Sequence, residues 1–280
     1  MRTDIIRFGI MAGSAMPVDL VQKVTTMFPV PRLYTNWGMT ELSSITTMTH
    51  HLDPIQKKTR SAGRLFPHFS AKIVEPNTSR VLPWGQKGEI VISGYGVMRG
   101  GYLHNPEKTA EALKQHSPDL DRGGVGPVDD AGLLRTWMHT GDEGFLDDDG
   151  YFIITGRIKD IVIRGGENIS PVEIEERLCG HPAIVQASVI GVHDARLGEE
   201  LAAFVELDKN HTMPTDGDLQ DWVRESLSRF KTPRHFWWIA GPQKGVPQEW
   251  PKTASGKLRK PDLREIAKSK FIELLYLTIL

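Results

Sequence analysis

Hydrophobic positions along the chain follow two patterns, short runs closed by glycine and longer stretches with helical spacing. The clearest run is the β-branched segment 161–163, which favours a strand and is followed by the pair Gly165-Gly166. The next residues, Ser170-Pro171-Val172-Glu173, combine a serine N-cap, a proline at the first helical position and a glutamate three residues on, as in a capping box. We therefore predict a strand, a Gly-Gly turn and a capped helix over 171–179.

Comparable patterns along the rest of the chain indicate an α/β protein. Apolar and β-branched runs predict strands at 8–13, 32–34, 71–74, 88–92, 151–154, 185–192, 200–207 and 235–239. Helical spacing predicts helices at 17–27, 106–113 and 218–229. We expect the first of these strands to be buried.

Two polar stretches predict connections between the elements. The sequence Asp147-Asp148-Asp149-Gly150 indicates a hairpin turn, since it lacks the alternating ligand spacing and distal glutamate of a calcium loop. The segment 115–133 is rich in glycine, aspartate and proline and predicts a surface loop, with Asp129-Asp130 as solvated charges.

Composition excludes several classes of protein. The chain has 280 residues, 39% hydrophobic and 25% charged, which suits one large or two modest globular domains. Its 34 basic and 35 acidic residues give a net charge of −1, so no long-range field would recruit nucleic acid or an anionic membrane. No apolar run reaches the roughly 18 residues of a membrane helix.

The single cysteine, Cys179, excludes an intrachain disulfide and fits a reducing compartment. Its place near the end of a predicted helix favours packing over a nucleophilic role. The N-terminal residues lack a signal-peptide pattern, and the C-terminus shows no peroxisomal tripeptide. We expect a cytoplasmic or other reducing intracellular location.

The full string 156–170, Gly-Arg-Ile-Lys-Asp-Ile-Val-Ile-Arg-Gly-Gly-Glu-Asn-Ile-Ser, resembles the junction of the AMP-forming acyl-CoA synthetases of the adenylate-forming, AMP-binding superfamily. In that family an Arg-x-(Lys/Asp)-Asp segment joins a large domain to a small swinging one. The resemblance implies a hinge at Lys159 and a CoA-binding turn at Gly165, Gly166 and Glu167. The Gly-Gly-Glu-Asn variant is more similar to CoA ligases than to peptide-synthetase adenylation domains, and no carrier domain follows Lys260.

Two further stretches resemble the nucleotide-binding motifs of the same family. The stretch 11–15 is similar to its Gly-rich loop beside adenine, and 36–41 to its aromatic-Gly-x-Thr-Glu motif. The resemblance implies nucleotide contacts from Gly13, Ser14, Ala15, Asn36, Trp37, Gly38, Met39, Thr40, Asp142 and Arg157. Trp37 would stack on adenine, Thr40 would contact phosphate and Glu41 would hold Mg²⁺, which takes one or two carboxylates plus phosphate oxygens. The alternatives are a core tryptophan and an ordinary helix start.

Three charged residues complete the implied site. Asp142, in a Thr-Gly-Asp motif, would receive the ribose hydroxyls, because a carboxylate can accept two hydrogen bonds from a diol. Arg157 would be a second ribose or phosphate contact. Lys257, in the string 251–257 (Pro-Lys-Thr-Ala-Ser-Gly-Lys), would reach the substrate carboxylate and α-phosphate, a role that suits a flexible ammonium. The alternatives are a turn aspartate, a surface arginine and a solvated basic loop, the last assigned to Lys252, Arg259 and Lys260.

The resemblance also implies a domain plan and an activity. It predicts the C-terminal part of a large AMP-binding domain at 1–158 (an α/β segment at 5–60 and a β-rich subdomain at 61–158), a small α+β domain at 159–270 and a dispensable apolar tail at 271–280. Catalytic Lys257, Thr40 and Glu41 would act with ATP, Mg²⁺ and coenzyme A. A carboxylic acid, fatty or otherwise acyl, would become an acyl-adenylate and then a CoA thioester, releasing pyrophosphate and AMP.

The family's Ser/Thr-Gly-rich phosphate loop does not occur in this sequence. The resemblance therefore spans nearly the whole chain, from Ile5 to about Lys268, but only the C-terminal half of the family. A truncated, non-catalytic paralogue that binds nucleotide or a partner stays open as the alternative. The sequence does not predict the acid or the oligomeric state.

Overall fold

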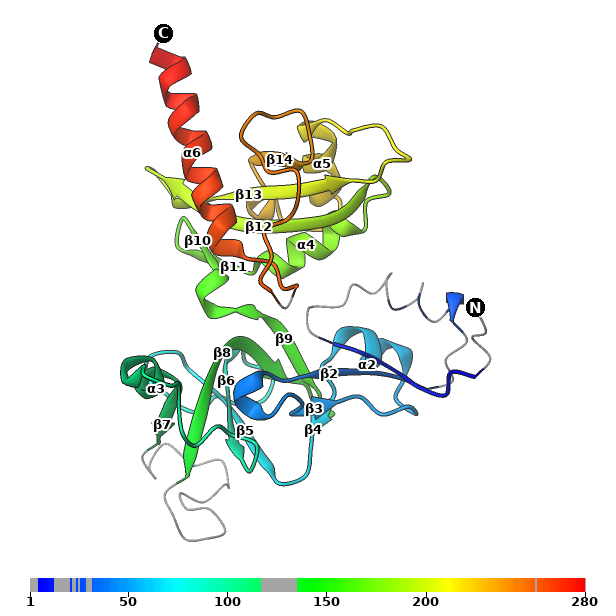
Figure 1. Cartoon of the computed structure of the whole chain (residues 1–280), viewed down its shortest axis with the longest axis vertical. Coiled ribbons are helices and arrows are strands. Elements are labelled where there is room, and N and C mark those ends of the chain that lie inside the picture. Colours follow the sequence, from blue (N-terminus) through cyan, green and yellow to red (C-terminus); the bar gives the residue numbers. More distant parts are fainter. Residues whose placement is uncertain are drawn as a thin grey trace. The chain divides into compact units, whose positions relative to one another are not determined.

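Figure 1 shows a computed structural model of the chain, which describes residues 5–12, 21, 24, 26–28, 32–116, 135–254 and 256–279, with side chains described as far as Phe271. The chain forms two compact units, Met1–Ile158 and Lys159–Leu280.

A small mixed sheet opens the first unit. Its strands, in spatial order, are β1 (Gly9–Met11), β2 (Leu33–Trp37), β3 (Thr47–Met48) and β4 (Arg64–Leu65), with the 3-10 turn η1 (Thr40–Leu42) and helix α2 (Ile55–Arg60) between them. β1 runs parallel to β2, and the other pairs are antiparallel.

The expectation of a buried strand at 8–13 is wrong. β1 has three residues and pairs only with β2 in the described part of the chain, so Ile10 keeps 49% of its surface exposed. Gly13 lies outside the described residues, as does most of the helix predicted at 17–27, of which Val21, Val24, Thr26 and Met27 are helical.

A larger antiparallel sheet follows and holds the core of the unit. Its strands are β5 (Phe69–Val74), β6 (Gly88–Gly94), β8 (Thr136–Leu146) and β7 (Leu113–Gln115) in spatial order, with β9 (Phe152–Arg157) on β8 and helix α3 (Pro106–Ala112) before β7. Ile90, Ile92, Met138 and Phe152 pack together in its core. The predicted strands and helix are all present with slightly different bounds. Most of the predicted surface loop, including Asp129-Asp130, lies outside the described residues.

The second unit is a sheet covered by helices on both faces. Its strands are β11 (Glu167–Ile169), β10 (Val162–Arg164), β13 (Gly198–Leu207) and β12 (Ile184–Asp194) in spatial order, with β14 (His235–Ile239) parallel to β13. The other elements are η3 (Ile158–Asp160), α4 (Pro171–Cys179), α5 (Asp216–Arg224), η4 (Arg229–Lys231) and α6 (Lys260–Ile279).

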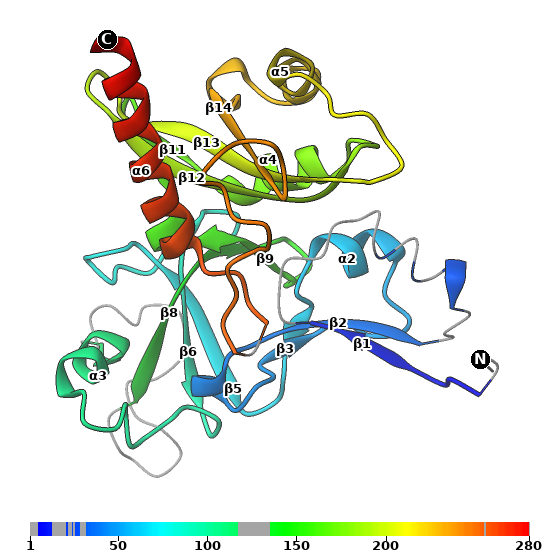
Figure 2. The same cartoon turned by 45° about the horizontal axis from the view of Figure 1, so that its top comes forward.

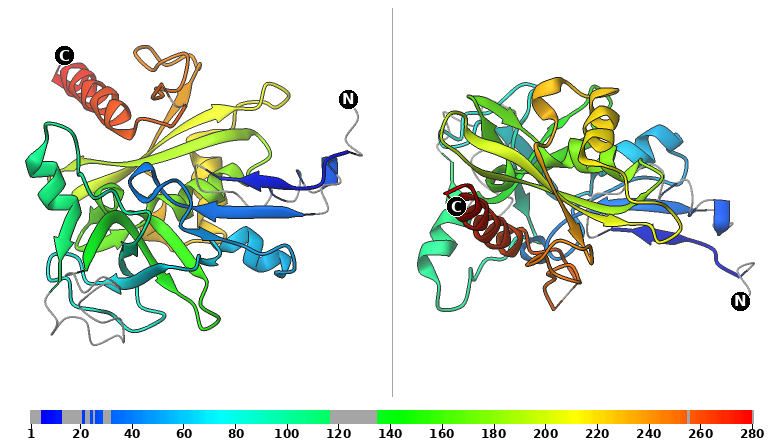
Figure 3. Two further views of the ribbon diagram at one scale, coloured as in Figure 1. Left: turned by 60° about the horizontal axis from the view of Figure 1, so that its bottom comes forward. Right: turned by 90° about the horizontal axis from the view of Figure 1, so that it is seen from above.

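Alternation along β13 explains the two layers, because successive side chains of a strand point to opposite faces. Leu201, Ala203 and Val205 join one core with residues of α4 and α5. Ala202 and Phe204 join a second core with residues of α6. Figures 2 and 3 show α6 on one side of this sheet and α4 and α5 on the other.

The Gly-Gly turn leads into a strand before the helix, which corrects the predicted strand, turn and helix. Gly165 and Gly166 both have positive φ (60° and 89°) and close a β10–β11 hairpin in which Arg164 pairs with Glu167. The predicted capping box is also wrong. Ser170 makes no side-chain cap bond to the helix, and the Glu173 carboxylate, which a capping box would direct at the Ser170 amide, lies 2.5 Å from the Lys231 ammonium.

Helix ends in this unit differ from expectation in two further places. The capping box that does form joins Thr215 and Asp218 at the start of α5, which ends at Arg224 rather than at 229. α6 continues without a break through 271–279, and the Phe271 ring lies 5.7 Å from that of Trp237. Phe271 therefore belongs to the core, and no structural boundary separates an apolar tail at that residue.

The structure bears on two expectations from the sequence, the absence of a membrane-spanning helix and the packing role of Cys179. Among the described residues, no helix is both long enough and apolar enough to cross a bilayer. Cys179, the last residue of α4, packs against the core, and burial raises the pKa of its thiol. A packing role for Cys179 fits both observations.

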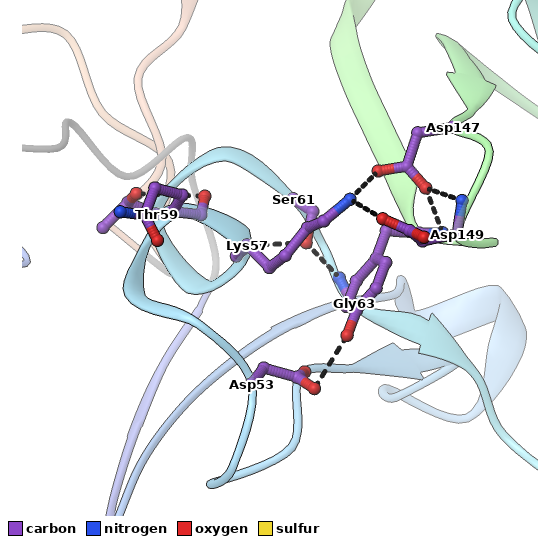
Figure 4. Close-up of polar contacts among 9 residues, drawn as sticks. Asp53, Lys57, Thr59, Ser61, Gly63, Asp147 and Asp149 are labelled. Atoms are coloured by element: carbon purple, nitrogen blue, oxygen red, sulfur yellow. Dashed lines mark hydrogen bonds and ion pairs between the residues drawn. The ribbon is translucent and has the colours of Figure 1, made fainter.

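The predicted hairpin turn between β8 and β9 is confirmed, and a lysine of α2 holds it (Figure 4). Lys57 Nζ lies 2.7 Å from both Asp147 Oδ2 and Asp149 Oδ2. Tyr151, at the end of the turn, donates its hydroxyl proton to Asp53 Oδ1 at 2.7 Å. Burial would raise the pKa of Asp147, but the Lys57 ammonium and backbone N–H donors in the turn lower it overall.

This pair predicts a pH-dependent contribution to stability. A carboxyl whose pKa is lowered on folding stabilises the protein above its ordinary pKa of about 3.9, and the effect disappears as pH falls through the folded value. Lys57→Met should lower the Tm by a few degrees at pH 7, and the difference from wild type should shrink between about pH 5 and pH 3. Lys87→Met, at an exposed lysine, is the control. An unchanged difference at low pH would contradict the assignment.

Candidate functional site

Two side chains from distant parts of the first unit converge on one buried carboxylate. Trp37 Nε1, at the end of β2, donates a hydrogen bond to Asp142 Oδ2 at 2.8 Å. Arg157 Nε, at the end of β9, lies 2.6 Å from Asp142 Oδ1. Asp142 is 4% exposed, whereas the Arg157 side chain is 43% exposed. Both carboxylate oxygens thus face groups that the sequence assigned to nucleotide binding.

The turn after Trp37 requires a glycine. The chain folds back at η1, so a Cβ on Gly38 would lie 2.2 Å from the Ser44 carbonyl oxygen. η1 then exposes Thr40 and half-buries Glu41. Asn36, just before the turn, has a buried side-chain Oδ1 without a hydrogen-bond partner in the described part of the chain.

Tyr102 is a site residue that sequence reasoning missed. Its hydroxyl donates to Glu41 Oε1 at 2.7 Å, and burial together with this carboxylate raises the pKa of Tyr102 to about 12. The Arg157 charge acts on the pKa of Tyr102 in the opposite direction. A tyrosine in a glycine-rich stretch carries no local signal that could have indicated this contact.

A cationic depression lies in the second unit. It has a volume of about 560 Å³, and its lining includes Arg164, Arg196, Arg224, Arg229, Arg234 and Phe230. Arg164 forms a bidentate pair with the buried carboxylate of Glu200. Among the described residues, Arg196, Arg229 and Arg234 have no carboxylate within 4 Å, so their charge is available to an anion.

The glycine turn and the lysine loop also belong to the second unit. A Cβ on Gly166 would meet nothing within 4 Å, and Glu167 is exposed. Lys257 is exposed in a loop closed by a hydrogen bond from Thr253 N to the Lys257 carbonyl oxygen at 2.7 Å. Lys159 is exposed within η3 and is the first residue of the unit.

The assignment of Lys260 to a solvated loop is wrong. Its ammonium is half-buried and lies 2.7 Å from Glu175 Oε1, because α6 begins here and packs on the sheet. Four residues on, Arg264 bonds Asp160 Oδ1 at 2.7 Å. These two pairs hold the start of α6, directly after the lysine loop, against α4 and η3.

Some predicted residues are not placed. Gly13, Ser14 and Ala15 lie outside the described residues. Within the described ranges, no group of three or more histidine, cysteine or acidic side chains could hold a metal by itself.

Family models match both units. The model of the AMP-binding enzymes matches residues 2–103, and that of the AMP-binding enzyme C-terminal domain matches residues 173–257. The chain belongs to the AMP-binding enzyme family, and the predicted α/β fold class is confirmed.

Named relatives are acyl-CoA ligases. The chain is 43% identical over 265 residues to acyl-CoA ligase sidI of Aspergillus fumigatus, covering 94% of this chain and 42% of that protein. It is 39% identical over 263 residues to acyl-CoA ligase SID4 of Ajellomyces capsulatus, with the same coverage. The chain thus spans less than half the length of these relatives.

Solved structures agree with this family. ATP-bound MatB from Rhodopseudomonas palustris matches with a TM-score of 0.73 and 28% identity, over 91% of this chain and 44% of that one. O-succinylbenzoate coenzyme A synthetase from Bacillus subtilis, in complex with AMP, matches with a TM-score of 0.71 and 27% identity, over 93% and 45%.

The close approach at Gly38 gives a test of the site's geometry. Gly38→Ala should lower stability by about 1–3 kcal/mol, as overpacking does, because the added methyl group meets backbone that cannot move aside. Gly100→Ala, where a Cβ would meet nothing within 4 Å, is the control and should leave the Tm nearly unchanged. Equal midpoints for the two variants in thermal unfolding would show that the turn is misplaced.

Proposed function

We propose that this chain is the nucleotide- and CoA-handling portion of an ATP-dependent acid–CoA ligase. A carboxylic acid and MgATP would give an acyl-adenylate and pyrophosphate, and CoA would then displace AMP to form the thioester. The observation that carries the proposal is the convergence of Trp37 and Arg157 on the Asp142 carboxylate. Similarity to proteins named acyl-CoA ligase supports it, and an acyl acid, fatty or otherwise, is the proposed substrate class.

The first unit would bind the adenosine part of the nucleotide. Trp37 offers a flat aromatic face for the base, and the buried Asn36 Oδ1 offers an acceptor for the exocyclic amine of adenine. Asp142 would accept hydrogen bonds from the ribose diol once the exposed Arg157 side chain moves toward ribose or phosphate. Gly13, Ser14 and Ala15 complete this set in the proposal.

Thr40 and Glu41 would act at the phosphates. The Thr40 hydroxyl is exposed and could donate to a phosphoryl oxygen, and Glu41 would supply the carboxylate oxygens that Mg²⁺ prefers. Bound Mg²⁺ would neutralise phosphate charge. Tyr102, by donating to Glu41 Oε1, limits the orientations that this carboxylate can adopt before the ion binds.

The second unit would supply groups for each half-reaction. The exposed ammonium of Lys257 suits stabilisation of charge developing at the acyl carboxylate and α-phosphate. The arginines around the 560 Å³ depression suit the phosphates of CoA, and Phe230 offers its adenine an aromatic face. Gly165-Gly166 and Glu167 would line the path of the pantetheine arm, and rotation about Lys159 would exchange the two arrangements.

Binding of AMP tests directly whether the Asp142 carboxylate belongs to a nucleotide site. AMP should raise the Tm of the wild-type chain in a concentration-dependent way, because a ligand that binds only the folded state stabilises it. Asp142→Asn should lose most of that shift, since an amide nitrogen cannot accept from the diol. Glu143→Gln, the neighbouring change of charge, is the matched control. Equal AMP shifts in all three proteins would refute the nucleoside site.

ATP–pyrophosphate exchange in the same chain separates catalysis from binding. If the chain catalyses ATP–pyrophosphate exchange, it forms the acyl-adenylate, which supports the proposed ligase activity. Binding of AMP and CoA without exchange, in the presence of candidate acids, would favour the alternative of a non-catalytic nucleotide-binding protein.

Substitutions at Lys257 and Gly166 should impair different half-reactions, adenylation and thioester formation respectively. Both are measured in a protein that joins this chain to the upstream half of the Aspergillus fumigatus relative. Lys257→Ala removes a cation from a site of developing negative charge, which costs about 10²–10³ in the rate of adenylation. It should still convert a pre-formed acyl-adenylate to thioester. Gly166→Leu should exchange pyrophosphate nearly normally and fail with CoA. Equal loss of both half-reactions in two folded variants would contradict the assignment.

A further inference from the structure

The strand that carries Asp142 is interrupted by a bulge at this residue. Across the β6–β8 pair, Glu89 lies opposite Glu143 and Val91 opposite His139. The three residues Thr140, Gly141 and Asp142 therefore stand opposite Ile90 alone. A bulge changes the direction in which nearby side chains point. Gly141 makes this bulge possible because glycine readily adopts a positive φ, here +69°.

Two side chains hold the bulge. Thr140 Oγ1 donates to the Ile90 carbonyl oxygen at 2.7 Å and accepts from the Asp142 amide at 3.1 Å. Glu89 Oε1 accepts from the Gly141 amide at 3.1 Å. Glu89 is thus the side chain that fixes the central residue of the bulge, one position before the carboxylate that meets Trp37.

A histidine pair orients Glu89 in turn. His139 Nδ1 lies 2.8 Å from Glu89 Oε2, and because an ionised carboxylate only accepts, this nitrogen carries the proton. His139 Nε2 lies 2.9 Å from His116 Nε2, so a hydrogen bond joins the two rings, with one of these nitrogens as donor and the other as acceptor. Burial alone would raise the pKa of Glu89, but His139 and the Gly141 amide lower it below its ordinary value.

The surroundings favour an ionised Glu89. Lys114, on β7, adds a further positive charge that acts on this carboxylate. Trp137 stacks on His116, and the Lys72 ammonium lies 4.0 Å from the centre of the Trp137 ring. The Glu89 side chain is 12% exposed and that of His139 6%, so water cannot easily replace either partner.

We propose that Glu89 and His139 are positioning residues for nucleotide recognition, which hold the Gly141 amide so that Asp142 meets the ribose diol. The inference rests on the proposed function for its ligand, but the positioning itself can be measured without nucleotide. Neither residue would touch the substrate, because both act through the bulge.

The ligand-free experiment follows the indole proton of Trp37 by NMR, assigned by its disappearance in Trp37→Phe. Its hydrogen bond to Asp142 should slow exchange with water. Glu89→Ala removes the acceptor of the Gly141 amide and should speed that exchange about tenfold, while Glu89→Gln, which keeps one oxygen acceptor, should be intermediate. Glu143→Gln is the matched control, because its carboxylate accepts from Thr155 instead. Wild-type exchange in Glu89→Ala would overturn the positioning role.

The ligand experiment compares AMP with 2′,3′-dideoxy-AMP, which lacks the diol. In Glu89→Ala, AMP affinity should fall about tenfold or more, as loss of a hydrogen bond to a charged group does, with dideoxy-AMP affinity unchanged. Equal weakening of both ligands would show a merely structural role and overturn the proposal. If wild type binds neither ligand, the proposed function fails, and the indole exchange alone then supports or overturns the positioning.

Discussion

The buried carboxylate of Asp142 is the constraint on which the first unit depends. A carboxylate that is 4% exposed is costly to bury unless each oxygen has a partner. Trp37 and Arg157 supply those partners, and in doing so they tie the end of β2 and the end of β9 to the bulge within β8. In the proposed function the same three side chains would exchange these contacts for a nucleoside, so the requirement for stability and the proposed capacity for binding share one set of atoms.

A corresponding constraint operates within the second unit. Lys260 and Arg264, both on the first turns of α6, are paired with Glu175 and Asp160. The lysine loop immediately before α6 is therefore attached to the segment that follows Lys159. In the proposed mechanism, a rotation at Lys159 would carry Lys257 with the whole unit rather than by a separate loop movement.

The sequence predicted elements with strong local patterns and missed contacts between distant ones. Apolar and β-branched runs located β6, β12 and β13, because alternation and turn residues are local properties. Local pattern could not show that the Glu173 carboxylate would pair with Lys231, or that Lys260 would be half-buried against Glu175. Tyr102, Glu89 and His139 were missed for the same reason, since their roles arise only when β6, β8 and η1 are brought together.

The proposed function requires the nucleoside to bind at Trp37 and Asp142. Titration of the chain with AMP, followed through the NMR signal of the Trp37 indole proton, tests it most directly. We expect a saturable shift of this signal with AMP, with a Kd equal to that from calorimetry, and we expect the shift to be lost in Asp142→Asn. Calorimetric binding of AMP with the Trp37 signal unmoved would place the nucleotide elsewhere and contradict the claim.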